Sequence, residues 1–538
     1  MRHLRIGVLE LVAGGSNRSL YARTMFPNFA SVMPQVVAVW CEQLGHGVSY
    51  EVYTGTGEVP RLLPDRLDVV FLCAFTHAAL LAYAASNLFR SRGSVTVLGG
   101  PHARAFPEHA RRHFDYVLGL TDRELLRGLL EGCEKQRPLG MRLAAMRQPE
   151  TLPGARERWR FIRQLQARTV LPSTPMLASL GCPYTCEFCV DATVPYQSLD
   201  LDQLADDLRF LAQQKGRARV VWHDPNFGVR FDACLNAIES AVAPGSMDFI
   251  AESSLSLLNK ARLQRLASMG FRAMLPGIES WNEFGNKSGV KNLVGARRLE
   301  SVIQQVRLIL EYIPYVQANF VFGLDSDEGE GPFDMTREFI EKVPGAFPAC
   351  ALLTAYGEST PLAGDLARSG RVLPVPFPFL YSGFISNVRP KHYSWSGFYE
   401  RLASLIEFAF AGRIVARRLR DTKHATARVV NLIRTFSAEG RGRAAMLRRF
   451  RMSLETDVAL RDFMEGETTR IPASMMKQLL HDLGDMRDWL PPGSIEYDAS
   501  TAATGSIAVA TLRFAGRSKG TPAPRSDSDA TPAQEEPS

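Results

Sequence analysis

The first 150 residues alternate between short, β-rich apolar runs and longer stretches with helical periodicity. The β-rich runs cover Leu4–Leu9, Val48–Tyr53, Leu67–Cys73, Val95–Leu98 and Asp115–Leu118, and the helical stretches cover Ala30–Leu44, His77–Arg92 and Asp122–Glu131. This rhythm is typical of βαβ units that build a parallel sheet. We therefore predict an α/β domain over residues 1–150 with a doubly wound sheet, and a ligand site at the carboxyl ends of its strands.

A second alternating series begins after an Arg- and Pro-rich stretch, 136–160, that we interpret as a linker. Its candidate strands are Met176–Leu180, Arg219–Trp222, Asp248–Ala251, Arg272–Leu275, Ala318–Phe322 and Ala351–Ala355. The helices between them include Leu201–Gln214, in which leucines recur on one face at helical spacing. This series predicts a partial (β/α)6 barrel over residues 160–385, open on one side, with its chemistry on the loops that follow the strands.

The pattern changes again after residue 385. Residues 386–515 have helical periodicity, many arginines and one short apolar run, Ile507–Phe514, so we expect a mainly helical C-terminal domain. Residues 516–538 are mostly Ser, Pro, Ala, Asp and Glu. Such a segment cannot bury enough apolar surface to offset its ordering entropy, and we predict a disordered tail.

Composition places the chain among folded proteins without a membrane span. It is 46% hydrophobic and 22% charged, and it contains no apolar run long enough to cross a bilayer. The N-terminus lacks a secretory pattern, so we expect a cytoplasmic protein. Much of the net charge of +7 comes from arginines between Arg413 and Arg451. They form either a solvated helical face or a surface for acidic partners, and no nucleic-acid motif accompanies them.

Three of the eight cysteines lie within eight residues of one another, directly after the first barrel strand. Cys182, Cys186 and Cys189 can converge on one small object from a single tight loop. Iron–sulfur clusters of the [4Fe–4S] type usually have four cysteine ligands, so three would leave one iron open for a chelating cofactor. One alternative is a zinc site, which wants a fourth ligand, and the closest candidate, His223, is far along the chain. The other alternative is three unrelated buried thiols.

The Cys-x3-Cys-x2-Cys motif resembles the signature of radical S-adenosylmethionine (SAM) enzymes. Further matches are the turn Trp222–Phe227, the segment Pro276–Ser280, which is similar to a "GIES" element, and Tyr356–Leu362, which is similar to a "GTPL" segment. The resemblance covers about residues 172–385. It implies a [4Fe–4S] cluster on the three cysteines and reductive cleavage of SAM to methionine and a 5′-deoxyadenosyl radical.

The same resemblance suggests which other residues contact the cofactors. Phe188 is expected to pack beside the cluster, where SAM binds. Glu279 and Glu252 are the candidates for the acidic residue on the ribose hydroxyls, and Asp224 is a candidate for contact with cofactor or substrate. For each carboxylate the alternative is a helix N-cap or a loop salt bridge.

The first domain resembles the Rossmann-like cobalamin-binding module found in one branch of that family. The best match is Val97–Ala103, where Gly99 and Gly100 would let a flat ligand approach the backbone, and where His102 is a candidate pocket residue. Many such modules carry a cobalt-ligating histidine after the first strand, but here that loop, Ala13–Arg18, has none. The resemblance thus implies bound cobalamin without a histidine ligand from this loop. The alternative is a cofactor-free domain.

Together these resemblances imply a cobalamin-dependent C-methyltransferase acting on an unactivated carbon. A radical cyclisation, ring rearrangement or oxidation would begin in the same way, and fold alone does not choose between these outcomes. An alternative of another class is a corrinoid or iron–sulfur sensor without turnover. As partners we expect a small-molecule or lipid substrate and an external one-electron reductant such as flavodoxin or ferredoxin.

Overall fold

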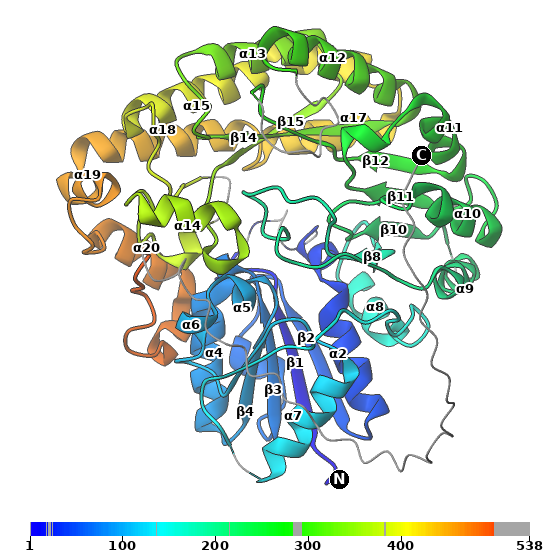
Figure 1. Ribbon diagram of the computed structural model, residues 1–538, viewed down its shortest axis with the longest axis vertical. Coiled ribbons are helices and arrows are strands. Elements are labelled where there is room, and N and C mark those ends of the chain that lie inside the picture. The colour runs from blue at the N-terminus through cyan, green and yellow to red at the C-terminus, as the bar shows by residue number, and fades with distance from the viewer. Residues whose placement is uncertain are drawn as a thin grey trace, which may run out of the picture.

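The structure is a computed structural model, and it describes residues 2–17, 19, 23, 25–135, 137–214, 216–282, 293–380 and 384–499. The expected tail, 516–538, and the run Ile507–Phe514 lie outside the described residues. Figure 1 shows the N-terminal domain in blue, with the barrel and the C-terminal helices arching over the carboxyl ends of its strands.

The N-terminal domain contains a six-stranded parallel sheet in the order β2-β1-β3-β4-β5-β6. The strands are β1 (Arg5–Leu11), β2 (Gly47–Tyr53), β3 (Val69–Ala74), β4 (Val95–Gly99), β5 (Tyr116–Leu118) and β6 (Met141–Leu143). The predicted parallel sheet is confirmed. The stretch expected to be a linker contributes β6, which pairs Met141 with Tyr116. Three residues are too few to show a strand period, so the pattern missed it.

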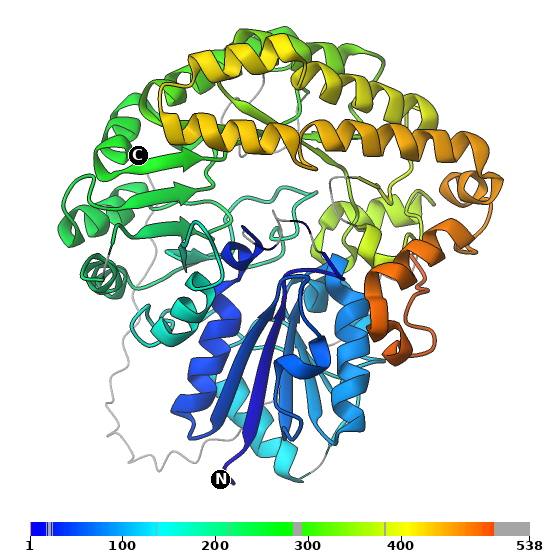
Figure 2. The same ribbon diagram turned by 180° about the vertical axis from the view of Figure 1, so that it is seen from behind.

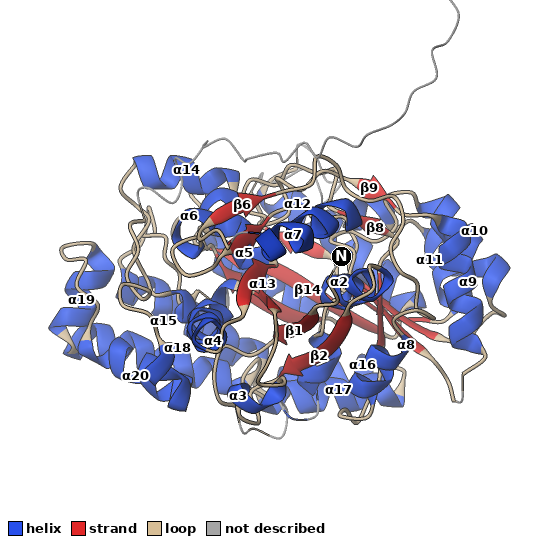
Figure 3. Ribbon diagram, turned by 90° about the horizontal axis from the view of Figure 1, so that it is seen from below, coloured by secondary structure: helices blue, strands red, loops and turns tan. Residues whose placement is uncertain are grey.

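Helices cover both faces of this sheet, as a doubly wound fold requires. Ile6 and Val8 of β1 pack on the side of α2 (Val32–Gln43) and α7 (Arg123–Lys135). Leu9 and Leu11 pack on the opposite side, against α4 (Ala79–Ser91). Figure 3 shows these helices on the two sides of the strands. The alternation follows from the strand period of two, which sends successive side chains to opposite faces.

The second sheet confirms the partial barrel. Its parallel strands run in the order β7-β10-β11-β12-β14, with β15 and β13 both paired to β14. The strands are β7 (Thr174–Met176), β10 (Arg219–Trp222), β11 (Asp248–Ala251), β12 (Phe271–Met274), β13 (Gly277–Glu279), β14 (Tyr315–Phe322) and β15 (Phe347–Leu352). The outer helices are α9 (Leu201–Ala212), α10 (Phe231–Ala241), α11 (Lys260–Met269), α12 (Gly295–Tyr312) and α13 (Gly331–Lys342).

The expected first barrel strand, Met176–Leu180, is divided in two. After β7 the chain leaves the sheet, and β8 (Ser179–Leu180) pairs antiparallel with β9 (Gln197–Ser198). The cysteine loop is therefore the connection of a small hairpin. Shorter elements are α3 (Val59–Leu62), α5 (Pro101–Ala105), α6 (Pro107–Ala110), α8 (Trp159–Gln166), α14 (Pro361–Arg368), and the 3-10 turns η1 (Phe26–Phe29), η2 (Thr76–Ala78), η3 (Leu255–Leu257), η5 (Gly357–Ser359) and η6 (Phe377–Phe379).

The C-terminal region is helical in its described part. It comprises α15 (Trp395–Ala409), α16 (Gly412–Asp421), α17 (Ala425–Phe436), α18 (Arg441–Thr456), α19 (Val458–Glu465), α20 (Ala473–Leu483) and η7 (Gly484–Trp489). Figure 2 shows the yellow and orange helices lying along the barrel and then descending to the first domain. There Asn87 of α4 donates a hydrogen bond to the carbonyl of Trp489 (3.0 Å). Within the described residues no helix is both long and apolar enough to cross a membrane.

Candidate functional site

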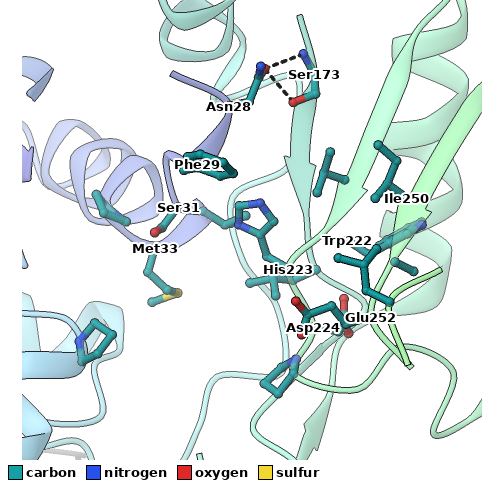
Figure 4. A pocket seen from close by; sticks show the side chains of 18 of the residues that line it. Asn28, Phe29, Ser31, Met33, Ser173, Trp222, His223, Asp224, Ile250 and Glu252 are labelled. Atoms are coloured by element: carbon teal, nitrogen blue, oxygen red, sulfur yellow. Dashed lines mark hydrogen bonds between the residues drawn. The ribbon is translucent and has the colours of Figure 1, made fainter. Parts of the chain in front are cut away.

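A cavity of about 1180 Å³ lies between the two sheets, at the carboxyl ends of their strands. The first domain lines it with residues at or just after the ends of β3, β4 and β5, including Gly99 and Gly100. The barrel lines it with residues that include His223, Asp224 and Glu252, and Figure 4 shows these three opposite Ser31 and Met33. A single cavity therefore joins the two edges at which the fold predicts ligands.

The cysteine loop begins at one wall of this cavity. Gly181, which lines the cavity, has a φ of +65°, and a Cβ there would lie 2.3 Å from the carbonyl oxygen of Pro195. Only glycine fits this position without displacing the returning end of the loop. Further along, the amide of Cys189 donates to the carbonyl of Cys186 (2.9 Å), so a tight turn links these two cysteines.

The three cysteines themselves do not line the cavity. Cys186 is buried, and Cys182 and Cys189 are half-buried. In the described part of the chain, no three His, Cys, Asp or Glu residues are grouped as a metal site. The donor set, three thiols from one loop at the carboxyl edge of the barrel, does suit an iron–sulfur cluster. The cluster assignment stays a prediction that rests on this chemistry.

Asp224 fixes the segment that leads into the cysteine loop. Its carboxylate accepts hydrogen bonds from the amide of Ala178 (3.0 Å) and the hydroxyl of Ser179 (2.6 Å). Burial raises the pKa of Asp224 to about 6, while these hydrogen bonds lower it. Asp224 also lines the cavity, so it both positions the loop and faces the ligand space.

His223 is a cavity residue that the sequence suggested only as a remote zinc ligand. Its amide donates to the carbonyl of Met176 (2.8 Å), which aligns the end of β10 with β7. Burial, with a smaller contribution from Arg158, lowers the pKa of His223 to about 4. The ring is therefore neutral at physiological pH and can donate or accept a hydrogen bond.

The two candidate glutamates occupy different places. Glu252 lines the cavity and is exposed to it. Glu279 lies at the end of β13, is half-buried and does not line the cavity. Among the described non-glycine residues only Glu279 has a positive φ, +67°, and a Cβ at Gly277 would lie 2.0 Å from its Oε1 atom. Backbone strain of this kind concentrates at functional sites.

Phe188 packs at the carboxyl ends of two barrel strands rather than in the cavity. It contacts a small apolar cluster that includes Leu324, Leu353 and Ala363. Next to it, the amide of Leu362 in α14 donates to the carbonyl of Glu187 (3.1 Å). These contacts hold the cysteine loop against the far side of the barrel mouth.

The residues after β4 divide between the cavity and the domain interior. Gly99 has open space where a Cβ would lie, and Gly100, at φ +91°, would place one 2.9 Å from Cys73 Sγ. His102 is fully buried, and its Nε2 atom lies 2.7 Å from the Tyr83 hydroxyl. Because α5 turns His102 away from the cavity, its position does not support the expected cofactor contact.

The loop that lacks the expected histidine packs outside the cavity. The amide of Ser16 donates to the carbonyl of Asp482 in α20 (2.9 Å), and a Cβ on Gly15 would collide with the same carbonyl. In the described lining of the cavity the histidines are His223 and His424, and neither belongs to the first domain. The open backbone at Gly99 therefore fits a flat ligand such as a corrinoid, without a histidine ligand from this domain.

Sequence reasoning missed the contacts that join the two domains beside the site. Arg104 of α5 forms an ion pair with Asp191 of the cysteine loop (3.1 Å), and Arg142 of β6 pairs with Glu358 of η5 (3.0 Å). Gly357 lies so close to α5 that a Cβ would be 2.1 Å from the carbonyl oxygen of Ala105. Partners this far apart in sequence leave no local signal.

Helix α17 was also missed as part of the site. Ala427, Val430 and Arg434 line the cavity from its inner face. Arg434 donates to the Tyr315 hydroxyl at the start of β14 (2.5 Å) and forms an ion pair with Glu439. The spacing of these three residues shows one helical face, but only the fold reveals what that face covers.

The radical SAM superfamily model matches residues 176–331. Two curated relatives come from Chlorobaculum tepidum. One is a bacteriochlorophyllide d C-12(1)-methyltransferase, 26% identical over 295 residues, which cover 54% of this chain and 64% of the relative. The other is a bacteriochlorophyllide d C-8(2)-methyltransferase, 25% identical over 327 residues, which cover 57% of this chain and 69% of the relative. The first match thus spans less than two thirds of that relative.

Solved structures show a related fold over most of the chain. The methyltransferase TsrM from Kitasatospora setae, with tryptophan and a SAM analogue bound, covers 84% of this chain and 99% of its own at 14% identity, with a TM-score of 0.54. The cobalamin-dependent radical enzyme OxsB, with aqua-cobalamin and SAM bound, covers 90% of this chain and 84% of its own at 13% identity, with a TM-score of 0.51. Residues 176–331 are thus similar to the radical SAM superfamily, and the fold of the chain resembles that of cobalamin-dependent radical SAM enzymes.

Proposed function

We propose that this protein is a cobalamin-dependent radical SAM methyltransferase that adds a methyl group to an unactivated carbon. The observation that carries the proposal is the single cavity in which the Gly99–Gly100 edge faces the barrel edge with Asp224 and Glu252. A methyl donor on one edge and a radical generator on the other would both reach a substrate held between them. The methyltransferase names of the two curated relatives support the same activity.

On the barrel side, Cys182, Cys186 and Cys189 would hold the cluster. When bound, the cluster supplies the electron for cleavage of SAM. An external reductant such as flavodoxin or ferredoxin would then return an electron to the cluster. Asp224 fixes the entry to the loop through Ala178 and Ser179. Glu252 and Glu279 offer carboxylates for ribose hydroxyls, and the apolar packing of Phe188 excludes water from the far side of the loop.

On the other side, Gly99 and Gly100 present backbone without side chains to the cavity. A corrinoid held there would supply the methyl group, and the open space at Gly99 would let it approach the backbone closely. The substrate class we propose is a small molecule or lipid with a largely apolar body. Phe29, Phe71 and Trp222 line the cavity and would pack against such a body.

Anaerobic reconstitution with iron and sulfide tests the proposal in two stages. Reduced protein should form 5′-deoxyadenosine from SAM, and the product should gain one methylene group in mass. A product of unchanged carbon count would favour a cyclisation, rearrangement or oxidation. Absence of 5′-deoxyadenosine from iron-loaded, reduced protein would instead favour a sensor without turnover.

A further inference from the structure

The outer face of α17 carries a continuous stripe of exposed apolar side chains. Val429, Leu432, Ile433 and Phe436 are 55%, 43%, 53% and 63% exposed. Their spacing of three, four and seven residues places them on one side of the helix. We call these four residues the α17 stripe.

The stripe is not the core-facing side of the helix. Ala427 and Val430 line the cavity on the inner side, and Asn431 and Thr435 are buried. An ordinary surface helix presents polar side chains on its outer face. An apolar stripe there marks a surface for a partner.

Basic side chains surround the stripe. Lys423, Arg428 and Arg441 are exposed, and none of them lies within ion-pair distance of a carboxylate among the residues the structure describes. The Arg441 guanidinium sits 5.0 Å from the centre of the Phe436 ring. The nearby acids are already paired, Asp421 with Arg420 and Glu439 with Arg434.

We propose that the α17 stripe docks on the surface of an anionic lipid bilayer. Helices that lie in the bilayer interface combine an apolar face with flanking Lys and Arg, which is the arrangement seen here. The basic side chains would add attraction to anionic headgroups. A nucleic-acid surface would use the charges but leave the four apolar side chains without a partner.

Docking would also place the rim of the cavity at the bilayer. His424 and Thr426, at the start of α17, are exposed and line the cavity. An amphiphilic molecule could then pass from the bilayer to the cavity along this helix. The α17 stripe would dock in the same way whichever reaction takes place in the cavity.

Vesicle flotation with the full-length holoprotein tests the docking. We expect binding to vesicles of equal parts phosphatidylcholine and phosphatidylglycerol, with little binding to phosphatidylcholine alone. The double variant Ile433→Gln/Phe436→Ser, and separately Lys423→Gln/Arg428→Gln, should each weaken binding about tenfold or more. The control Leu139→Gln/Met146→Gln removes two exposed apolar side chains of the first domain and should bind normally.

A second measurement excludes other occupants of the stripe. In a Phe436→Trp variant, iodide should quench the emission of this tryptophan in the absence of vesicles. When phosphatidylglycerol vesicles are added, the emission should shift to the blue. Protection from iodide without vesicles, or a dimer that Ile433→Gln dissociates, would show that another part of this chain or a second copy covers the stripe. Either result, or equal flotation of the variants and the control, would overturn the proposal.

Discussion

Arg104 and Asp191 form an ion pair across the two domains of the site, with Nη2 and Oδ1 3.1 Å apart and side chains 22% and 26% exposed. Arg104 belongs to α5, which follows the Gly99–Gly100 turn, and Asp191 lies two residues after Cys189. The pair therefore links the edge proposed for cobalamin to the loop proposed for the cluster. Arg104 also lines the cavity.

Breaking this pair should uncouple the two halves of the reaction. In Arg104→Gln we expect 5′-deoxyadenosine to form at a near-normal rate while methylated product falls severalfold, because the ion pair would no longer hold α5 beside the cysteine loop. The exchange Arg104→Asp/Asp191→Arg should recover part of the coupling. The interaction contributes about 1 kcal/mol, as is usual for partly exposed pairs. Arg61→Gln, which removes an exposed pair with Glu58, is the control and should change neither product.

The assignment of Cys186 as a cluster ligand can be tested by comparing it with Cys234, a buried cysteine of similar exposure. Cys186 is 5% exposed and Cys234 is 4% exposed. Cys186→Ala should abolish both the brown colour of the reconstituted protein and SAM cleavage, whereas Cys234→Ala should retain both. Iron content, absorbance and 5′-deoxyadenosine yield check this. Colour and cleavage retained by the Cys186 variant would contradict the cluster assignment.

Much of the fold is predictable because the chain encodes it locally. Most strands of both sheets appear as β-rich runs, and α9 follows from leucines at helical spacing together with the cap at Asp200, whose carboxylate accepts from the Asp202 amide. Three strands escaped. The strands β6 and β13 are only three residues long, and β8 leaves the barrel sheet because it finds an antiparallel partner in β9.

The site was less predictable than the fold. The motif placed Asp224 and Glu252 at strand ends, and both line the cavity, but the local pattern could not show that His102 turns toward Tyr83. Nor could it show the inner face of α17 or the Arg104–Asp191 pair. These features depend on contacts between segments far apart in the chain, which a single sequence does not display.

Asp224→Asn should weaken the cysteine loop without unfolding the barrel. The amide keeps one of the two acceptor oxygens, and its NH2 group, which only donates, would face either the Ala178 amide or the Ser179 hydroxyl. We therefore expect lower iron retention and at least a tenfold loss of SAM cleavage. Because burial raises the pKa of Asp224 to about 6, wild-type activity should fall as pH drops through about 6. The variant should lack this acid limb. Asp202→Asn, at an exposed position of α9, should behave as wild type.

Substitutions at Glu279 and Gly277 test whether the strained backbone at Glu279 serves to bind SAM. Glu279→Gly should cost no stability, because glycine adopts the φ of +67° without the strain of roughly 1–2 kcal/mol that a side chain incurs. The affinity for SAM should nevertheless fall. Gly277→Ala should also raise the KM for SAM, because the new methyl group would displace the Glu279 carboxylate. Unchanged SAM binding in both variants would assign Glu279 a role in the local loop only.

A buried chain of hydrogen bonds couples the first domain to the end of the helical region. His109 Nε2 lies 3.1 Å from the carbonyl oxygen of Glu496, so this nitrogen carries a proton and donates it. In the neutral ring Nδ1 then accepts from the Tyr83 hydroxyl (3.0 Å), which in turn accepts from His102 Nε2 (2.7 Å). Protonation of His109 would remove the acceptor on which this chain depends.

Acid should therefore release the 496–497 segment from α4 and α6. Burial lowers the pKa of His109 to about 4, so the folded state binds a proton less readily than the unfolded state, where the pKa is near 6.5. The free energy of unfolding is then unaffected above about pH 6.5 and falls as pH drops toward about 4, by about 3 kcal/mol for this group. Urea unfolding of His109→Gln should show a shallower loss of stability between pH 6.5 and 4.5 than wild type. His481→Gln, at an exposed histidine of α20, should keep the wild-type dependence of stability on pH. Equal pH dependence in all three proteins would show that protonation of His109 does not affect stability.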